Sequence, residues 1–237
     1  MKVITPDVKN KKINKEILTE LLNQAKANKD AISKQQQGKK FWRLIRLLLF
    51  TTSGWHKALH NTGAYIKSKM EPFYYGDYTL YGTKAEDRCD QMAELNMIQK
   101  FKSEGYRVEI IHHGLIIDDN DPYLATSLDA EMLLYDTRKD KNKRYCLEYK
   151  CFHETVEEKK VASVRGFMQE EYYYQVQGQM HVTGIEDSYF FNYSPEKLQF
   201  EHHVYNEQWV KEVIPELKRI YWDLFAPELY KIKGLFD

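Results

Sequence analysis

Apolar and polar residues alternate along the chain with two different periods, and these periods predict its helices and strands. A period of two, typical of strands, runs through residues 106–118, 123–136 and 144–152, and shorter strand candidates occupy 188–194 and 198–205. Apolar residues recur at helical spacing within 17–25, 83–104, 168–183 and 207–224. A further helical stretch at 41–60 is interrupted near "TTSG".

The order of these elements predicts a fold class. Polar runs at 118–122 and 137–143 separate the first three strands, so these strands can pair in antiparallel fashion. A helix, three strands, a helix, two strands and a helix follow one another. This succession indicates a mixed α/β (α+β) domain with a central mixed sheet flanked by helices.

The front of the chain differs from the rest in charge. Residues 1–46 contain 12 Lys and Arg against 4 Asp and Glu, whereas the whole chain contains 35 of each. The polar stretch "SKQQQGKK" at 33–40 is typical of a linker. We therefore predict a basic helical extension at 1–40 and a main domain at 41–237. The extension could contact phosphates, although a solvated lysine-rich helix explains the same charges.

Several classes of protein are disfavoured. The three cysteines, Cys89, Cys146 and Cys151, form no CxxC pair, which argues against a disulfide framework and a cysteine zinc site. The N-terminus lacks the apolar core of a signal peptide, and the longest apolar run, at 47–50, is far too short to span a bilayer. We expect a soluble intracellular protein without a membrane partner, in the cytoplasm or the nucleus.

Two histidine pairs invite a zinc interpretation, but their spacing argues against it. His112 is followed directly by His113, and His202 by His203. Adjacent residues of a strand point to opposite faces, so neither pair can chelate one ion well. We interpret both pairs as structural or exposed.

Three charged residues at strand spacing suggest a metal site. Glu148 and Lys150 are two residues apart, so they share one face of their strand, and Ser127 and Asp129 are expected to share a face of the preceding strand. If the strands pair, two carboxylates, a hydroxyl and an ammonium converge, and hard oxygen ligands suit Mg²⁺. The pattern alone is weak, because E-x-K in a strand is more often a surface salt bridge.

The surrounding motifs give the pattern a context. From about residue 41 to 230 the chain resembles the lambda exonuclease and YqaJ-type viral recombinase family of the PD-(D/E)XK nuclease superfamily. Five blocks match in order: "FWRLIRLLLFTTSGW" with Trp42, Arg46 and Ser53; "YGTKAE" with Gly82 and Glu86; "TSLDA" with Ser127 and Asp129; "LEYKC" with Glu148 and Lys150; and "YYYQVQGQMHVTG" with Tyr172 and Gln175. The resemblance implies a restriction-endonuclease-like core.

The resemblance also implies roles for these residues. Asp129 and Glu148, with the backbone carbonyl of Tyr149, would bind Mg²⁺ or Mn²⁺, and Lys150 would position the attacking water and stabilise the phosphate. Glu86 would reach a second metal or a water in the outer shell, although a glutamate at a helix start is common for reasons of the helix dipole.

The later helix and the front of the main domain would supply the remaining groups. Gln175 would project toward Lys150 or the water, and Gln179, one turn further, can share its face. Arg46, Ser53 and Ser127 resemble a pocket for the 5′-phosphate of a DNA end, which suits the planar guanidinium of arginine.

The function implied is a Mg²⁺-dependent exonuclease that acts 5′ to 3′ on double-stranded DNA ends and leaves 3′ single strands for recombination. Relatives of this kind form ring-shaped trimers and work with single-strand annealing proteins. An endonuclease or RNA-cleaving relative and a non-catalytic DNA-binding protein of the same fold remain alternatives. The family's S-P-D-G is S-L-D-A here, so Leu128 and Ala130 replace a proline and a glycine, and Phe152 replaces the proline of K-C-P.

Overall fold

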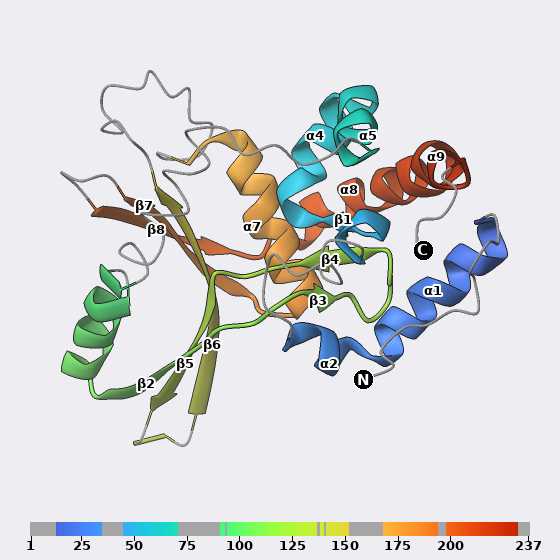
Figure 1. The fold of residues 1–237 in the computed structure, drawn as a ribbon. Coiled ribbons are helices and arrows are strands. Elements are labelled where there is room, and N and C mark those ends of the chain that lie inside the picture. Colours follow the sequence, from blue (N-terminus) through green and yellow to red (C-terminus); the bar gives the residue numbers. More distant parts are fainter. Residues whose placement is uncertain are drawn as a thin grey trace. The chain divides into compact units, whose positions relative to one another are not determined.

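The computed structural model describes residues 13–34, 45–70, 91–151 without positions 93, 137 and 140, 168–193, and 198–231 (Figure 1). The chain forms two compact units. The first comprises the described residues of Met1–Pro72, Gly114–Ser127 and Asn206–Asp237. The second comprises those of Phe73–His113 and Leu128–Tyr205.

A five-stranded mixed sheet forms the centre of the second unit. Its strands lie in the order β2-β5-β6-β7-β8, with bounds β2 Tyr106–Ile111, β5 Ala130–Asp136, β6 Lys141–Cys151, β7 Asp187–Tyr193 and β8 Leu198–Val204. All neighbouring strands are antiparallel except β6 and β7, which are parallel. The chain reaches β7 from β6 by way of α7, Glu170–Thr183, as a parallel pair requires a long connection.

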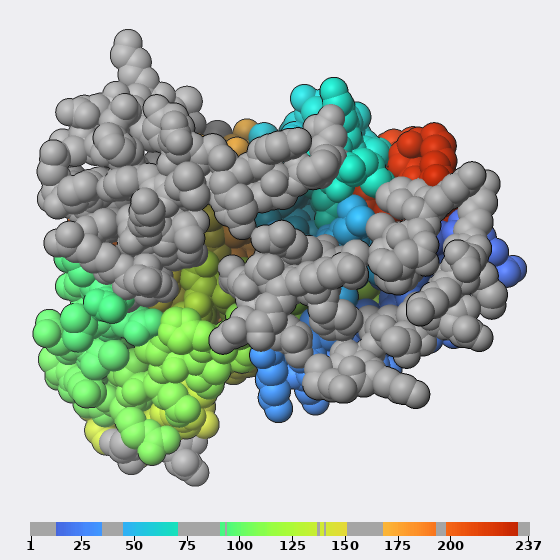
Figure 2. Space-filling model, in the orientation of Figure 1, coloured from blue at the N-terminus to red at the C-terminus, as the bar shows by residue number. Residues whose placement is uncertain are grey.

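The alternation along β6 divides its side chains between two different environments. Tyr145, Leu147 and Tyr149 belong to a buried apolar cluster that also contains Met97 and Phe101. These last two residues come from the helical segment 94–103 (green in Figures 1 and 2). The alternate residues of β6 contact α7 instead, for example through Cys146 and Thr183. The sheet of this unit therefore has a helix on each face.

The helix α7 is unusual because it buries amides rather than only apolar residues. Gln175, Gln177 and Gln179 are all buried, and buried polar groups require hydrogen-bond partners. The helix ends at Gly184, whose φ of 65° lies in the left-handed region that glycine tolerates best.

The first unit contains a small sheet and several helices. Its strands lie in the order β1-β4-β3, with bounds β1 Phe50–Thr51, β3 Ile116–Ile117 and β4 Leu124–Thr126. The helices are α1 Lys15–Ala27, α2 Lys29–Ser33, η1 Thr52–Gly54, α4 Trp55–His60, α5 Thr62–Met70, α8 Glu207–Arg219, η2 Ile220–Phe225 and α9 Ala226–Leu229. The predicted helix at 17–25 is confirmed as α1, capped by the Asn14 side chain.

The N-terminal helices pack within this first unit. Lys29 forms an ion pair with Asp119 at 2.6 Å, and the Lys26 ammonium donates to the Asp119 carbonyl. The N–H of Gly114 donates to the carbonyl of Ser33. These contacts tie α1 and α2 to the loops on either side of β3. The predicted boundary at residue 40 stays a prediction.

Two of the predicted strands are each two shorter strands. Residues 106–118 contain β2 and β3, and residues 123–136 contain β4 and β5. The expectation that Ser127 and Asp129 share a strand face is wrong, because residues 127–129 lie between β4 and β5. The physical reason is long-range pairing: β4 pairs with β1 and β3, whereas β5 pairs with β2 and β6. The predicted interruption of the helical stretch at 41–60 is confirmed, because β1 and η1 lie at "TTSG" before α4 begins.

Candidate active site

A buried ion pair occupies the face of β6 that contacts α7. Glu148 and Lys150 share this face, and Glu148 is only 2% exposed. The Lys150 ammonium donates to Glu148 Oε1. A buried carboxylate requires partners of this kind, because burial without them carries a large desolvation cost. Glu148 therefore lies in the interior of the unit, whereas Lys150 remains partly exposed, so the pair is not an ordinary surface salt bridge.

Asp129 joins this pair through the backbone of β6. The last antiparallel pair between β5 and β6 joins Ala130 to Leu147. Just beyond it, the N–H of Tyr149 donates to Asp129 Oδ2 at 2.6 Å. The carboxylate of Asp129 is thereby fixed against the segment that carries Glu148 and Lys150. The structure thus brings together the three residues of the predicted D-E-K pattern within one unit.

The two departures from the family motif are accommodated in the core. Leu128 is 1% exposed, and Ala130 is fully buried at the start of β5. Neither side chain displaces Asp129, whose carbonyl also accepts a hydrogen bond from His112 Nδ1 at 2.9 Å. The replaced proline and glycine therefore leave the carboxylate anchored on both its side chain and its backbone.

Lys150 is held in its charged form. Burial opposes the charge, but the carboxylates of Glu148 and Asp129 outweigh it and raise the pKa of Lys150 above its ordinary value. The ammonium also lies 5.2 Å from the ring centre of Tyr172, a cation–π distance. Tyr172 in turn stacks on Phe190. A protonated lysine in this position can donate hydrogen bonds to an anion.

Two glutamines of α7 converge on Glu148. The Gln175 amide donates to Glu148 Oε1 at 2.7 Å, and the Gln179 amide donates to Glu148 Oε2. Gln175 was expected to reach Lys150 or a water, but its partner is the carboxylate. Gln179 was noted only as sharing the face of Gln175. The spacing of four residues was the available indication, because it places both amides on one side of a helix.

A second group of predicted residues lies in the first unit. Arg46 belongs to the helical turn at 45–48, and its guanidinium is 3.4 Å from Thr51 Oγ1 on β1. Burial lowers the pKa of Arg46 from its usual value, because a desolvated cation is disfavoured. A guanidinium in this state favours an anionic ligand, which would restore the lost solvation.

Ser53 and Ser127 flank a hydroxyl pair that joins their two segments. Thr52 in η1 and Thr126 at the end of β4 form a hydrogen bond of 2.8 Å between their hydroxyls. Ser53 is exposed. The Ser127 hydroxyl is buried and has no hydrogen-bond partner among the residues that the structure describes. The Thr52–Thr126 bond therefore ties together the two segments that carry these serines.

Gly54 allows this turn to pack closely. A Cβ atom at Gly54 would lie 2.5 Å from Cε2 of Tyr65, which is closer than any carbon contact tolerates. Tyr65 in turn packs edge-on against Phe50 of β1. The residue that follows Ser53 is thus restricted to glycine by the packing of α5.

Lys69 belongs to the same region but was not predicted from the sequence. Its ammonium donates to the backbone carbonyls of Arg46 and Leu49. These carbonyls lie at the end of the turn that carries Arg46, so Lys69 caps that turn. Burial, and then the charge of Arg46, lower the pKa of Lys69 to about 7.

Replacing Lys69 by methionine is expected to remove a pH-dependent part of the stability. The folded-state pKa of about 7 lies below the ordinary value of 10.5. The unfolded chain therefore binds more protons between these pH values, and the free energy of unfolding rises with pH across this window. From pH 7 to pH 9, the free energy of unfolding of wild type should rise by about 2 kcal/mol more than that of the variant.

Urea unfolding at the two pH values measures this difference. Lys67→Met is the matched control, because Lys67 lies on the same helix but is exposed. This control should keep the wild-type pH dependence. A Lys69→Met variant that also keeps it would contradict the assigned pKa.

Histidines of the two sequence pairs lie beside carboxylate groups. His112 Nε2 lies 3.2 Å from Glu94, His113 Nε2 lies 2.8 Å from Glu131, and His202 Nε2 lies 2.6 Å from Asp187. Burial opposes the charge of Glu131, but His113 and Arg144 outweigh it and lower the pKa of Glu131 to about 2. These contacts fit the structural role expected for the first histidine pair.

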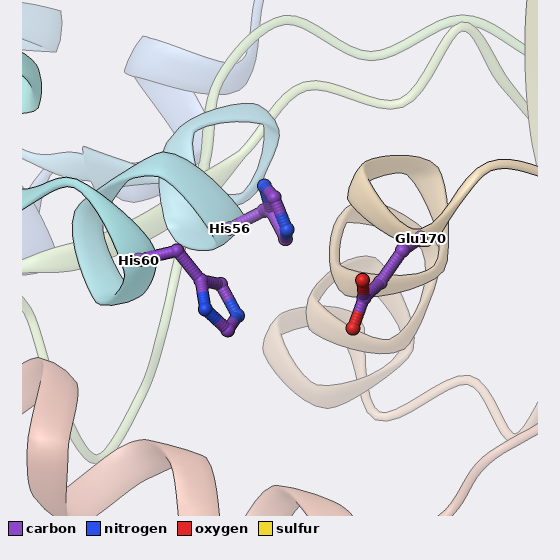
Figure 3. A group of neighbouring side chains, drawn as sticks. All are labelled: His56, His60 and Glu170. Carbon is purple, nitrogen blue, oxygen red and sulfur yellow. The ribbon is translucent and has the colours of Figure 1, made fainter. Parts of the chain in front are cut away.

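A further pair of histidines lies on successive turns of α4. Figure 3 shows His56 and His60 projecting from this helix, and their ring centres are 4.5 Å apart. The figure also shows Glu170 in the first turn of α7. The two histidines belong to the first unit and Glu170 to the second.

Some of the predicted residues cannot be placed. Trp42, Gly82 and Glu86 lie outside the described residues. The expectation that Glu86 reaches a second metal or a water in the outer shell is therefore still a prediction. Coordination of the metal by the backbone carbonyl of Tyr149 is also still a prediction.

Comparison with known proteins decides the family. The family model of the YqaJ-like viral recombinase domain matches residues 42–186. The chain belongs to this family. The YqaJ-like match begins just before Arg46 and ends just after α7, so it spans Asp129, Glu148 and both glutamines. It confirms the resemblance that the sequence motifs indicated.

Solved structures support the YqaJ-like fold. The alkaline exonuclease of Laribacter hongkongensis superposes with a TM-score of 0.61 at 18% identity, covering 81% of this chain and 94% of the other. The same enzyme in complex with dAMP gives a TM-score of 0.60 at 18% identity, with coverages of 81% and 94%. The prediction of a mixed α/β nuclease fold is confirmed. No curated protein matches the sequence significantly. Among the described helices, none combines the length and apolar character needed to cross a membrane.

Proposed function

We propose that the protein is a Mg²⁺-dependent exonuclease that acts on the ends of double-stranded DNA. It would degrade the 5′ strand in the 5′-to-3′ direction and leave 3′ single strands for recombination. The observation that carries the proposal is the convergence of Asp129, Glu148 and Lys150 in one unit. Two carboxylates beside a charged lysine form the donor set that a phosphodiesterase needs.

The residues fit a hard divalent cation. Asp129 and Glu148 offer carboxylate oxygens, the ligands that Mg²⁺ and Mn²⁺ prefer. Glu148 is almost completely buried among hydrogen-bond donors, so its position is fixed before any ion binds. When bound, a divalent cation would offset charge that builds up on the scissile phosphate.

Lys150 supplies a positive charge and hydrogen-bond donors beside the two carboxylates. Its ammonium is kept protonated by two carboxylates, and 24% of its side chain remains exposed. It can therefore donate hydrogen bonds to a phosphate oxygen or to the attacking water. Donors that are already in place stabilise developing charge without reorganisation.

Arg46, Ser53 and Ser127 would recognise the 5′-phosphate of the DNA end. A half-buried guanidinium with a lowered pKa and a buried hydroxyl without a partner among the described residues both support an anion-binding role. The structurally similar exonuclease has been solved with dAMP, a deoxynucleoside monophosphate of the kind that stepwise hydrolysis would release. The trimeric ring and the strand-annealing partner rest on the sequence resemblance.

Digestion of defined DNA substrates tests the proposal. Linear duplexes with 5′-phosphate or 5′-hydroxyl ends are incubated with Mg²⁺ beside a closed circle. We expect release of 5′-mononucleotides from phosphorylated ends, an intact circle, and no activity in Lys150→Ala. A nicked circle with equal cleavage of all ends would indicate an endonuclease. No hydrolysis with either Mg²⁺ or Mn²⁺ would indicate a DNA-binding protein.

Asp129→Asn should separate metal binding from folding. The asparagine oxygen can still accept the hydrogen bond from the Tyr149 N–H, so the thermal midpoint without metal should change little. An ion at about 100 times its dissociation constant stabilises the folded wild type by about 2.7 kcal/mol. We expect Mn²⁺ to raise the thermal midpoint of wild type but not of the variant. Equal shifts in both proteins would place the ion elsewhere.

A further inference from the structure

Gln179 contacts Glu148, a proposed metal ligand, directly, although the sequence indicated only that it can share a helix face with Gln175. It lies one turn after Gln175 on α7 and is completely buried. Its amide donates to Glu148 Oε2. A carboxylate only accepts hydrogen bonds, so the contacting atom must be the amide nitrogen and not the oxygen. The orientation of the Gln179 amide is therefore determined by its partner.

The hydrogen bonds to Glu148 distinguish its two oxygens. Oε1 accepts from both the Lys150 ammonium and the Gln175 amide, which together occupy its two lone pairs. Within the described part of the chain, the hydrogen bonds to Oε2 come from Gln179 alone. One lone pair of Oε2 is thus left to bind a cation.

The other end of the same amide is also significant. Gln179 Oε1 is buried and has no hydrogen-bond partner in the part of the chain that the structure describes. A buried acceptor without a partner is unfavourable, because it has lost its hydrogen bonds to water. It belongs to the same amide group whose nitrogen donates to Glu148 Oε2, so a donor that arrives with the cation, such as water, could satisfy it.

We propose that Gln179 is a positioning residue of the metal site. Its amide nitrogen holds Glu148 so that Oε2 presents a free lone pair to a divalent cation, and its amide oxygen accepts a hydrogen bond from water that accompanies the ion. This inference rests on the proposed function, since it requires an ion at Asp129 and Glu148. Residues that orient a metal ligand typically change metal affinity by about 10–100-fold when they are replaced.

Mn²⁺ binding to the full chain, followed by the loss of the free-ion paramagnetic resonance signal, tests the inference without reference to activity. Gln179→Met keeps the length of the side chain but removes both polar atoms. We expect it to weaken Mn²⁺ binding by about 10–100-fold. The Mn²⁺ concentration for half-maximal nuclease activity should rise in parallel, while KM for DNA stays unchanged.

Gln177→Met is the matched control. Gln177 lies on the same helix and is 1% exposed, but its amide donates to the carbonyl of Val204 at 3.0 Å and not to Glu148. Its replacement should cost similar stability and change Mn²⁺ affinity less than about twofold, because its amide does not donate to a proposed metal ligand. Equal weakening in both variants would overturn the inference, since it would reflect general loosening of α7.

Two further comparisons separate loss of folding and loss of the metal site from loss of the role of Gln179. If Gln179→Met does not fold, Gln179→Asn shortens the side chain while keeping it polar, and the same loss of affinity is expected. Wild-type affinity in a folded Gln179 variant overturns the inference. A different result would show that the proposed metal site itself is wrong. In that case wild type and Asp129→Asn would bind Mn²⁺ equally.

Discussion

Replacing Lys150 by methionine is expected to lower kcat on duplex DNA by at least about 10²-fold while the protein remains folded. Among the residues that the structure describes in this unit, the ammonium of Lys150 is the cationic group that pairs with Glu148. It is kept charged by Glu148 and Asp129. Its loss removes a donor that is already in place for an anionic transition state, and such donors typically contribute factors of this size.

Folding should survive the change because Glu148 keeps other partners. The amides of Gln175 and Gln179 still donate to both oxygens of the carboxylate. Methionine matches the length of the lysine chain and can pack beside Tyr172. Single-turnover digestion measures the rate of hydrolysis, and circular dichroism checks the fold.

Lys143→Met is the control for this experiment. Lys143 lies on the same strand but is exposed, and it pairs with Leu134, toward the far end of the β5–β6 ladder from Leu147. We expect wild-type activity from it. A Lys150 variant that retains more than about a tenth of the wild-type kcat would contradict the role given to the ammonium.

The part of the site that depends on local periodicity could be predicted from the sequence. Glu148 and Lys150 are two residues apart in an alternating stretch, so their common face follows from strand geometry alone. The spacing of Gln175 and Gln179 likewise fixes their common side of α7. What local spacing could not supply is the partner, and both amides proved to contact Glu148.

The parts that depend on long-range pairing could not be predicted. A strand-like sequence pattern covers residues 123–136, although the chain changes from one sheet to another at 127–129. Which sheet a strand joins depends on partners distant in the sequence. The role of Lys69 could not be predicted for the same reason, because the sequence "IKSKM" is typical of an exposed helix end. Only the contact of its ammonium with the turn at 45–48 distinguishes it.

Replacing Arg46 by alanine is expected to abolish most of the preference for 5′-phosphorylated ends. Charged hydrogen bonds of the kind that a guanidinium makes to phosphate contribute about 1.5–3 kcal/mol. The ratio of kcat/KM for phosphorylated over hydroxyl ends should therefore fall by roughly 10–150-fold. Arg46→Lys keeps the charge but loses the planar fork, so an intermediate ratio is expected.

Comparing the activity of each variant on 5′-phosphorylated and 5′-hydroxyl ends separates recognition of the phosphate from the stability of the protein. Activity on 5′-hydroxyl ends should stay close to wild type, since that substrate does not use the pocket. Arg219→Met is the control, because Arg219 is an exposed arginine of the same unit that pairs with Glu216. If Arg46→Ala instead lowers activity on both ends equally, Arg46 acts through the fold of the turn that Lys69 caps. In that case the phosphate must be bound by other residues.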